Sequence, residues 1–147
     1  MPKMPLGEFA DKLNLLLPQM FKEFARRQQN ELYKGKITLP QFVLLDFLWR
    51  KGPAKMTELA RTMSVTTAAM TGIITRLVRD NYASRNYDPN DRRIIRIEIT
   101  AKGENLVKKI NLNRREMIID IFGRISETER RDYLGILEHI CDILISS

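Results

Sequence analysis

Apolar side chains recur at spacings of three and four residues along most of the chain, which predicts a mainly helical protein. The first such stripe covers residues 8–33, where Pro18 predicts a kink or an interruption because proline removes a backbone donor. A second helix begins near Leu39 and stops at Gly52. It is apolar on most faces, so we expect it to lie at the centre of the core.

Two short helices separated by a tight turn follow. Thr57 is expected to cap the first, and Thr66 is expected to cap the second, which covers residues 67–80. One face of the second helix is apolar and the other is small and polar; the apolar face carries Met70, Ile73, Ile74 and Leu77, and the opposite face Thr67, Ala68, Thr71, Gly72, Thr75 and Arg76. Asn81 tolerates the left-handed conformation that ends a helix. The pattern predicts a helix-turn-helix.

A β-hairpin is expected directly after this motif. Residues 82–87 and 93–100 have strand character, and the Asp-Pro-Asn-Asp sequence between them is a strong turn signal. Such a hairpin is the wing of a winged helix. Two further amphipathic helices complete the chain, one over residues 101–122 and one starting at a capping box at Ser126. The predicted fold class is therefore mainly α, a winged helix-turn-helix flanked by N- and C-terminal helices.

Composition and charge indicate the cellular compartment and the kind of partner to expect. No stretch approaches the roughly 20 apolar residues of a membrane helix, and the N-terminus lacks the pattern of a secretory signal. A single cysteine excludes an internal disulfide framework. We therefore expect a cytoplasmic protein without a membrane partner. The formal net charge of +7 favours a polyanionic partner.

Positive charge is concentrated on the helix-turn-helix and wing. The span of residues 76–96 contains no lysine and six arginines, namely Arg76, Arg79, Arg85, Arg92, Arg93 and Arg96. A guanidinium can donate two parallel hydrogen bonds to a phosphate or a guanine edge. From the wing turn, Arg92 and Arg93 can reach a minor groove, whose negative potential attracts arginine. Asp91 is expected to pair with Arg93 or another wing arginine and to hold the loop in shape.

The small residues on the second helix would let its backbone sit deep in a major groove of double-stranded DNA. The predicted DNA-binding residues are Thr66, Thr67, Ala68, Thr71, Thr75, Arg76, Arg79, Arg85, Arg92 and Arg93.

These features resemble the MarR family of bacterial and archaeal regulators. The resemblance rests on the Met-Thr-Glu-Leu-Ala segment at 56–60, the capped helix, the wing at 88–93 and the exit Ile-Glu-Ile-Thr-Ala-Lys-Gly at 97–103. The Asp91-x-Arg93 wing signature is fairly specific, whereas Asn81 stands where the family usually has glycine.

This resemblance implies a transcriptional regulator that binds a palindromic operator as a homodimer, with recognition helices in successive major grooves. Repression is the expected effect, and activation stays open as the alternative. The chain would form a single unit, in which 37–103 is the DNA-binding region and 1–36 and 104–147 are dimerisation helices. The apolar stripes of these flanking helices exceed what one small winged helix can cover, which agrees with a dimer.

Family members are commonly released from DNA by a small aromatic or anionic ligand, or by cysteine oxidation. A pocket would lie between the dimerisation helices and the winged helix; its candidate lining residues, each also interpretable as ordinary core, are Met20, Phe24, Phe42, Leu45 and Trp49. Cys141 is interpreted as a buried interface thiol. The family's peroxide sensors carry their cysteine in the first helix, and this chain has none there.

An enzyme is not expected. The single histidine, His139, has no evident metal-ligand companion, and the sequence has no phosphate-binding loop or nucleophile elbow. We therefore expect no metal and no cofactor. One alternative stays open, a winged helix that binds RNA or a protein partner in place of duplex DNA.

Overall fold

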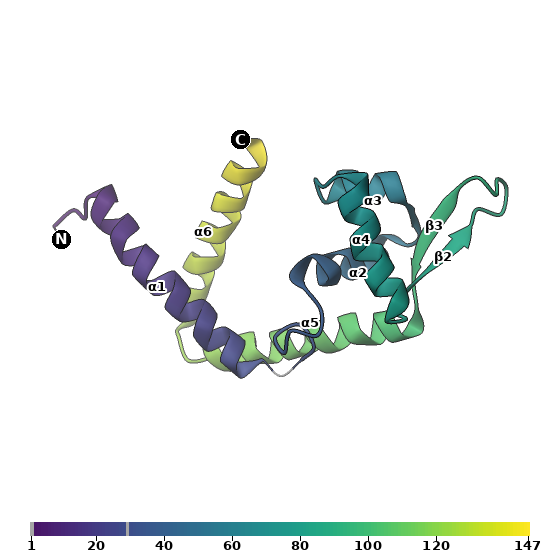
Figure 1. Ribbon diagram of the computed structural model, residues 1–147. Helices are drawn as coiled ribbons and strands as arrows, with labels where there is room; N and C mark the ends of the chain where they lie inside the picture. The colour runs from purple at the N-terminus through teal and green to yellow at the C-terminus, as the bar shows by residue number, and fades with distance from the viewer. Residues whose placement is uncertain (1, 29) are drawn as a thin grey trace. The chain divides into compact units, whose positions relative to one another are not determined.

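The computed structural model describes residues 2–28 and 30–147. Within these ranges the chain forms six helices and three strands, in the order α1 (Leu6–Arg27), α2 (Leu39–Lys51), β1 (Ala54–Lys55), α3 (Met56–Thr62), α4 (Thr67–Arg79), β2 (Ala83–Tyr87), β3 (Ile95–Ile99), α5 (Ala101–Phe122) and α6 (Glu127–Ser146) (Figure 1). This order confirms a mainly α, winged helix-turn-helix fold. The chain divides into two compact units, Met1–Asn113 and Arg114–Ser147.

The core of the first unit lies where α2, α3, α4, β3 and the start of α5 meet. Its most deeply buried apolar side chains are Leu44, Leu45, Leu48, Leu59, Met70, Ile74, Leu77, Ile97, Val107 and Ile110. The apolar face predicted for α4 is thus the face that packs inward, with Ile73 partly buried at its edge. Because α5 supplies Val107 and Ile110, the core continues beyond residue 103.

The sheet is antiparallel with the order β1-β3-β2. The predicted hairpin is confirmed, and Ala83 pairs with Ile99 while Tyr87 pairs with Ile95. Strand β1 was not predicted. Because β1 extends to Lys55, α3 begins at Met56 with Lys55 as its N-cap, so the prediction that Thr57 caps this helix is wrong.

Other helices begin and end at residues whose own side chain or backbone conformation caps them. The Thr66 hydroxyl accepts a hydrogen bond from the Ala69 backbone N–H, which confirms it as the α4 cap. Asn81 has a φ of 64° and Gly52 a φ of 86°, as expected for residues that end helices. Ser126 forms the predicted capping box at the start of α6.

Helix α1 continues through Pro18, so of the two outcomes expected there the interruption is wrong, and the kink stays a prediction. The helix ends at Arg27 and not at residue 33. The side chain of Asn30 accepts the backbone N–H groups of Leu32 and Tyr33, and this local turn replaces a further helical turn.

Helix α5 is held tightly against the start of the wing. A Cβ atom at Gly103 would lie 2.1 Å from the backbone oxygen of Tyr82, so only glycine allows this approach. In the second unit α6 buries no residue. None of the helices within residues 2–28 and 30–147 is long and apolar enough to cross a membrane.

Candidate nucleic-acid interface

The outward face of α4 consists of small residues that no other part of the described chain covers. Thr67, Ala68, Thr71 and Thr75 are all exposed, and a Cβ built on Gly72 meets no atom within 4 Å. The backbone of α4 is therefore accessible along this face. A groove of DNA could approach it closely without displacing large side chains.

The threonine hydroxyls on this face have a defined hydrogen-bonding state. Thr71 Oγ1 donates to the carbonyl oxygen of Thr67 at 2.8 Å, and Thr75 Oγ1 donates to that of Thr71 at 2.7 Å. Arg85 Nη2, from β2, donates to Thr75 Oγ1 at 3.0 Å. Because its hydrogen points to the helix backbone, the Thr71 hydroxyl presents acceptor lone pairs outward, whereas the Thr75 hydroxyl already accepts from Arg85.

The Arg85–Thr75 bond also joins two elements, since Arg85 belongs to the hairpin and Thr75 to α4. The exposed face of α4 and the base of the wing therefore form one surface. Figure 1 shows β2 and β3 extending beyond α4 to a turn.

At the wing turn, Asp91 holds Arg93 as the sequence suggests. The carboxylate accepts hydrogen bonds from Arg93 Nε at 3.1 Å, Arg93 Nη2 at 3.0 Å and the Arg93 backbone N–H at 3.0 Å. These bonds lower the pKa of Asp91, and the carboxylate raises the pKa of Arg93. The guanidinium itself stays exposed, with 90% of its side-chain surface accessible.

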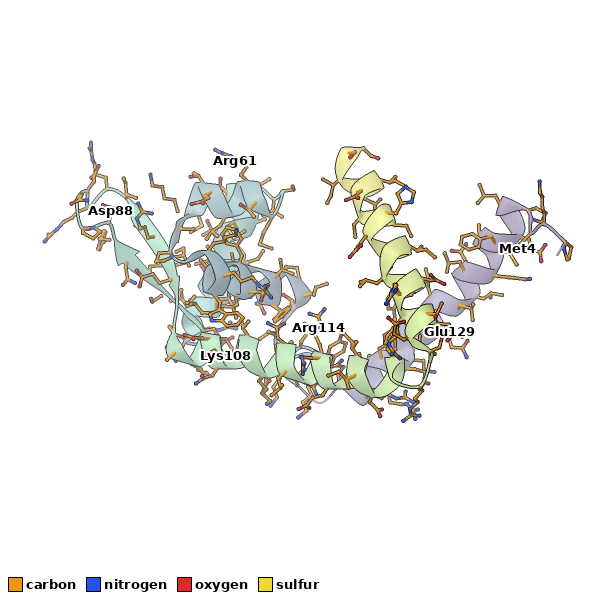
Figure 2. All side chains as sticks on the ribbon, turned by 180° about the vertical axis from the view of Figure 1, so that it is seen from behind. Met4, Arg61, Asp88, Lys108, Arg114 and Glu129 are labelled. Carbon is orange, nitrogen blue, oxygen red and sulfur yellow. The ribbon has the colours of Figure 1, made fainter. Side chains whose placement is uncertain are left out.

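A second wing aspartate, which the sequence reading treated only as a turn residue, is buried. Asp88 is 8% exposed and accepts a hydrogen bond from Arg96 Nε at 2.8 Å. This bond is the largest cause of a lowered pKa at Asp88, and the backbone N–H of Asn90 adds to it. Arg96 differs from the other arginines of the cluster because its partner carboxylate is buried and its own side chain is only 35% exposed. Figure 2 labels Asp88 at the turn end of the hairpin.

The other predicted cations are placed as follows. Arg76, Arg79, Arg85 and Arg92 are exposed, and Arg79 pairs with Asp80 at 3.2 Å. Among residues 2–28 and 30–147, no ion pair or side-chain hydrogen bond is found for Arg76 or Arg92. Sequence reasoning missed Lys55, which reaches the hairpin because β1 pairs with β3, and whose charge helps to lower the pKa of Asp91.

The five candidate pocket residues differ in burial. Phe42 and Leu45 are buried in the winged-helix core, which favours their interpretation as ordinary core, whereas Met20 and Phe24 of α1 are half-buried. An open hollow of about 420 Å³ is lined by Leu48, Trp49, Gly52, Pro53, Glu98, Ile99 and Glu104. Of the five candidate pocket residues, this lining includes Trp49.

On α6, Cys141 and His139 are both exposed in the single chain. A buried interface thiol at Cys141 therefore requires a partner and stays a prediction. No group of three or more residues capable of holding a metal ion is found in the described part of the chain.

Comparison with known proteins gives consistent matches. The MarR family model matches residues 37–95, from the start of the core to β3. The chain is 31% identical over 117 residues to the uncharacterised HTH-type transcriptional regulator YpoP of Bacillus subtilis, covering 80% of this chain and 82% of that protein.

Solved structures share the fold. The chain is similar to RV1404 from Mycobacterium tuberculosis, with a TM-score of 0.80 and 23% identity over 97% of this chain and 96% of that one. It is also similar to a mutant of MepR from S. aureus bound to oligodeoxyribonucleotide. There the TM-score is 0.66 and the identity 20%, over 92% of this chain and 97% of that one.

Proposed function

Because the chain belongs to the MarR family of HTH-type transcriptional regulators, we propose that it binds specific sequences of double-stranded DNA as a homodimeric repressor. In this proposal α4 enters the major groove and the wing contacts the adjacent minor groove. Two copies place two such helices on the half-sites of a palindromic operator. The protein acts by binding and not by catalysis, in the cytoplasm.

The observation that carries the proposal is the continuous surface from α4 to the wing. It combines an uncovered face of small residues with the exposed guanidinium groups of Arg76, Arg92 and Arg93. Small residues admit a groove closely, and arginines bind its phosphates and edges. The MepR mutant of the same fold is bound to oligodeoxyribonucleotide, which supports DNA as the ligand.

The homodimer is supported by apolar surface on the flanking helices. Helix α6 exposes large apolar side chains along most of its length, namely Tyr133, Leu134, Ile136, Leu137, Ile140, Ile143, Leu144 and Ile145. Helix α1 adds Leu6, Phe9, Leu13, Leu15, Leu16 and Phe21. Apolar surface of this extent marks an interaction site. A second copy of the same helices would cover it by the two-fold pairing that most homodimers use.

Release by a small aromatic or anionic ligand is the last part of the proposal, and it rests on the family resemblance. The half-buried Met20 and Phe24 of α1 support a site beside the dimerisation helices.

The proposal is tested by binding of a fluorescent duplex from the protein's own upstream region, beside a scrambled duplex, across a salt series. We expect selective binding with a steep salt slope, since each neutralised phosphate contributes about 0.9 to the slope. Arg93→Ala should weaken binding to every duplex and lower the slope by about 1. Arg124→Ala is the matched control, because it removes the same charge from an exposed arginine in the second unit and should leave binding unchanged.

An unchanged affinity of Arg93→Ala would refute the wing contact. Single-stranded DNA and RNA of equal length and sequence complete the experiment. Preference for either of these over the duplex would refute the proposal, and preference for RNA would favour the RNA-binding alternative.

A further inference from the structure

We propose that Asp88 is a positioning residue that holds the wing loop in its DNA-binding shape by anchoring it to Arg96 of β3. This inference rests on the proposed DNA-binding function. It assigns different tasks to the two wing aspartates: Asp91 orients an arginine that contacts DNA, and Asp88 orders the loop that carries it.

The first support is burial. The buried polar side chains of the described residues are Gln28, Asn30, Gln41 and Asp88, and Asp88 alone among them carries a charge. A charge is removed from water at a high cost unless it is paired and hydrogen-bonded. Asp88 must therefore gain its partners when the loop closes, and losing one of them would leave a buried charge poorly compensated.

The second support is the geometry of its two oxygens. Asp88 Oδ1 accepts the backbone N–H groups of Asn90 at 2.9 Å and Asp91 at 3.3 Å. Asp88 Oδ2 accepts Arg96 Nε at 2.8 Å. One oxygen thus shapes the turn and the other fastens it to the strand, so the carboxylate links the loop to the sheet.

The backbone closes the same loop. The N–H of Asp88 donates to the carbonyl oxygen of Ile94 at 2.8 Å, and the N–H of Ile94 donates to that of Asp91 at 3.0 Å. Arg92 and Arg93 lie inside this closed segment. A loop that is already ordered loses less conformational freedom when it binds, so its arginines bind DNA more tightly than those of a loose loop.

In the test, removing the charge of Asp88 and loosening the loop have opposite effects on DNA affinity. Asp88→Asn keeps the oxygen that accepts from Asn90 and Asp91, but it places an amide donor against the donor Nε of Arg96. It also removes a negative charge from the DNA-facing hairpin, which by Coulomb attraction alone would tighten binding. If Asp88 positions the loop, binding should weaken by about tenfold instead.

Glu98→Gln is the matched control. Glu98 lies on β3 of the same hairpin, pairs with Ser84 of β2, and its carboxylate accepts from Asn86 Nδ2 at 2.8 Å. The substitution removes the same charge, so we expect unchanged or slightly tighter binding. Arg96→Gln breaks the anchor from its other end, at a side chain that is 35% exposed. Because it also removes a positive charge, which weakens DNA binding by itself, its effect on the loop is measured by hydrogen exchange and not by affinity. The two anchor substitutions should be non-additive when combined.

Amide hydrogen exchange in the free protein gives a readout that does not depend on DNA. We expect faster exchange at Ile94 and Asp91 in Asp88→Asn and Arg96→Gln, with unchanged exchange in α4. Binding as tight as wild type together with unchanged exchange would overturn the role of Asp88. Absence of duplex binding by the wild-type protein would instead overturn the proposed function, and it would be recognised because every variant and the control would then behave alike.

Discussion

Gly72 offers the sharpest test of how closely α4 approaches DNA. Glycine inside an exposed helix costs about 1 kcal/mol relative to alanine. A Cβ built at Gly72 meets no atom within 4 Å, so no steric penalty opposes the gain in Gly72→Ala. We therefore expect the variant to be more stable by about 1 kcal/mol, which corresponds to a rise in Tm of about 2–4 °C at this chain length.

The same methyl group should weaken DNA binding. It lies on the outward face of α4, between Thr71 and Thr75, where the proposed major groove comes closest to the helix backbone. We expect the affinity for the specific duplex to fall by about tenfold, comparable to the loss of one base contact. Thermal unfolding and fluorescence anisotropy on the same preparation measure the two effects together.

Gly135→Ala is the control for this pair of measurements. Gly135 also lies within a helix, α6, and has no atom within 4 Å of its built Cβ. Its helical spacing places it on one face of α6 with Arg131 and His139 and not on the apolar stripe of the proposed dimer contact, so Gly135→Ala should leave DNA affinity unchanged. A Gly72→Ala protein that is stabilised and still binds the specific duplex as tightly as wild type would refute the close approach of α4.

Two further substitutions test the packing of α5 against Tyr82 and the proposed contact of Thr71 with DNA bases. Gly103→Ala should destabilise the protein by about 3 kcal/mol, because its Cβ would lie 2.1 Å from the Tyr82 backbone oxygen; a urea midpoint equal to wild type would contradict this contact. Thr71→Val keeps the shape of the side chain but removes an outward acceptor, so it should reduce discrimination at adenine or cytosine amino groups by about tenfold on a panel of operator variants. Equal losses on all duplexes would reassign Thr71 to a backbone contact.

The parts of the fold that the sequence predicts correctly are those determined locally. Thr66 and Ser126 cap helices through residues three positions away, and Asn81 and Gly52 end helices through their own backbone preferences. Chemistry over such short separations is visible in a sequence. The alternation of residues in β3 similarly predicts a strand with one buried side.

The errors at α3 and at Asp88 arise because residues distant in the sequence determine the structure there. Strand β1 exists because Ala54 pairs with Ile97, and this pairing moves the start of α3 away from the cap expected at Thr57. The role of Asp88 depends on the register of β3, which brings Arg96 within reach. In the sequence both wing aspartates belong to one turn signal, and no local pattern separates the buried one from the exposed one.

For the flanking helices, too, the sequence predicts the helix but not the surface that packs against it. Their apolar stripes are evident from periodicity, yet α6 buries no residue in the single chain, and Ile145 is 82% exposed. Isolated helices are marginal in water, and their stability in proteins comes from packing an apolar face. The winged-helix core supplies its own packing, whereas in the proposed homodimer a second copy packs against the flanking helices. In the proposed homodimer, the spacing of the two DNA half-sites is therefore determined by helices that do not touch DNA.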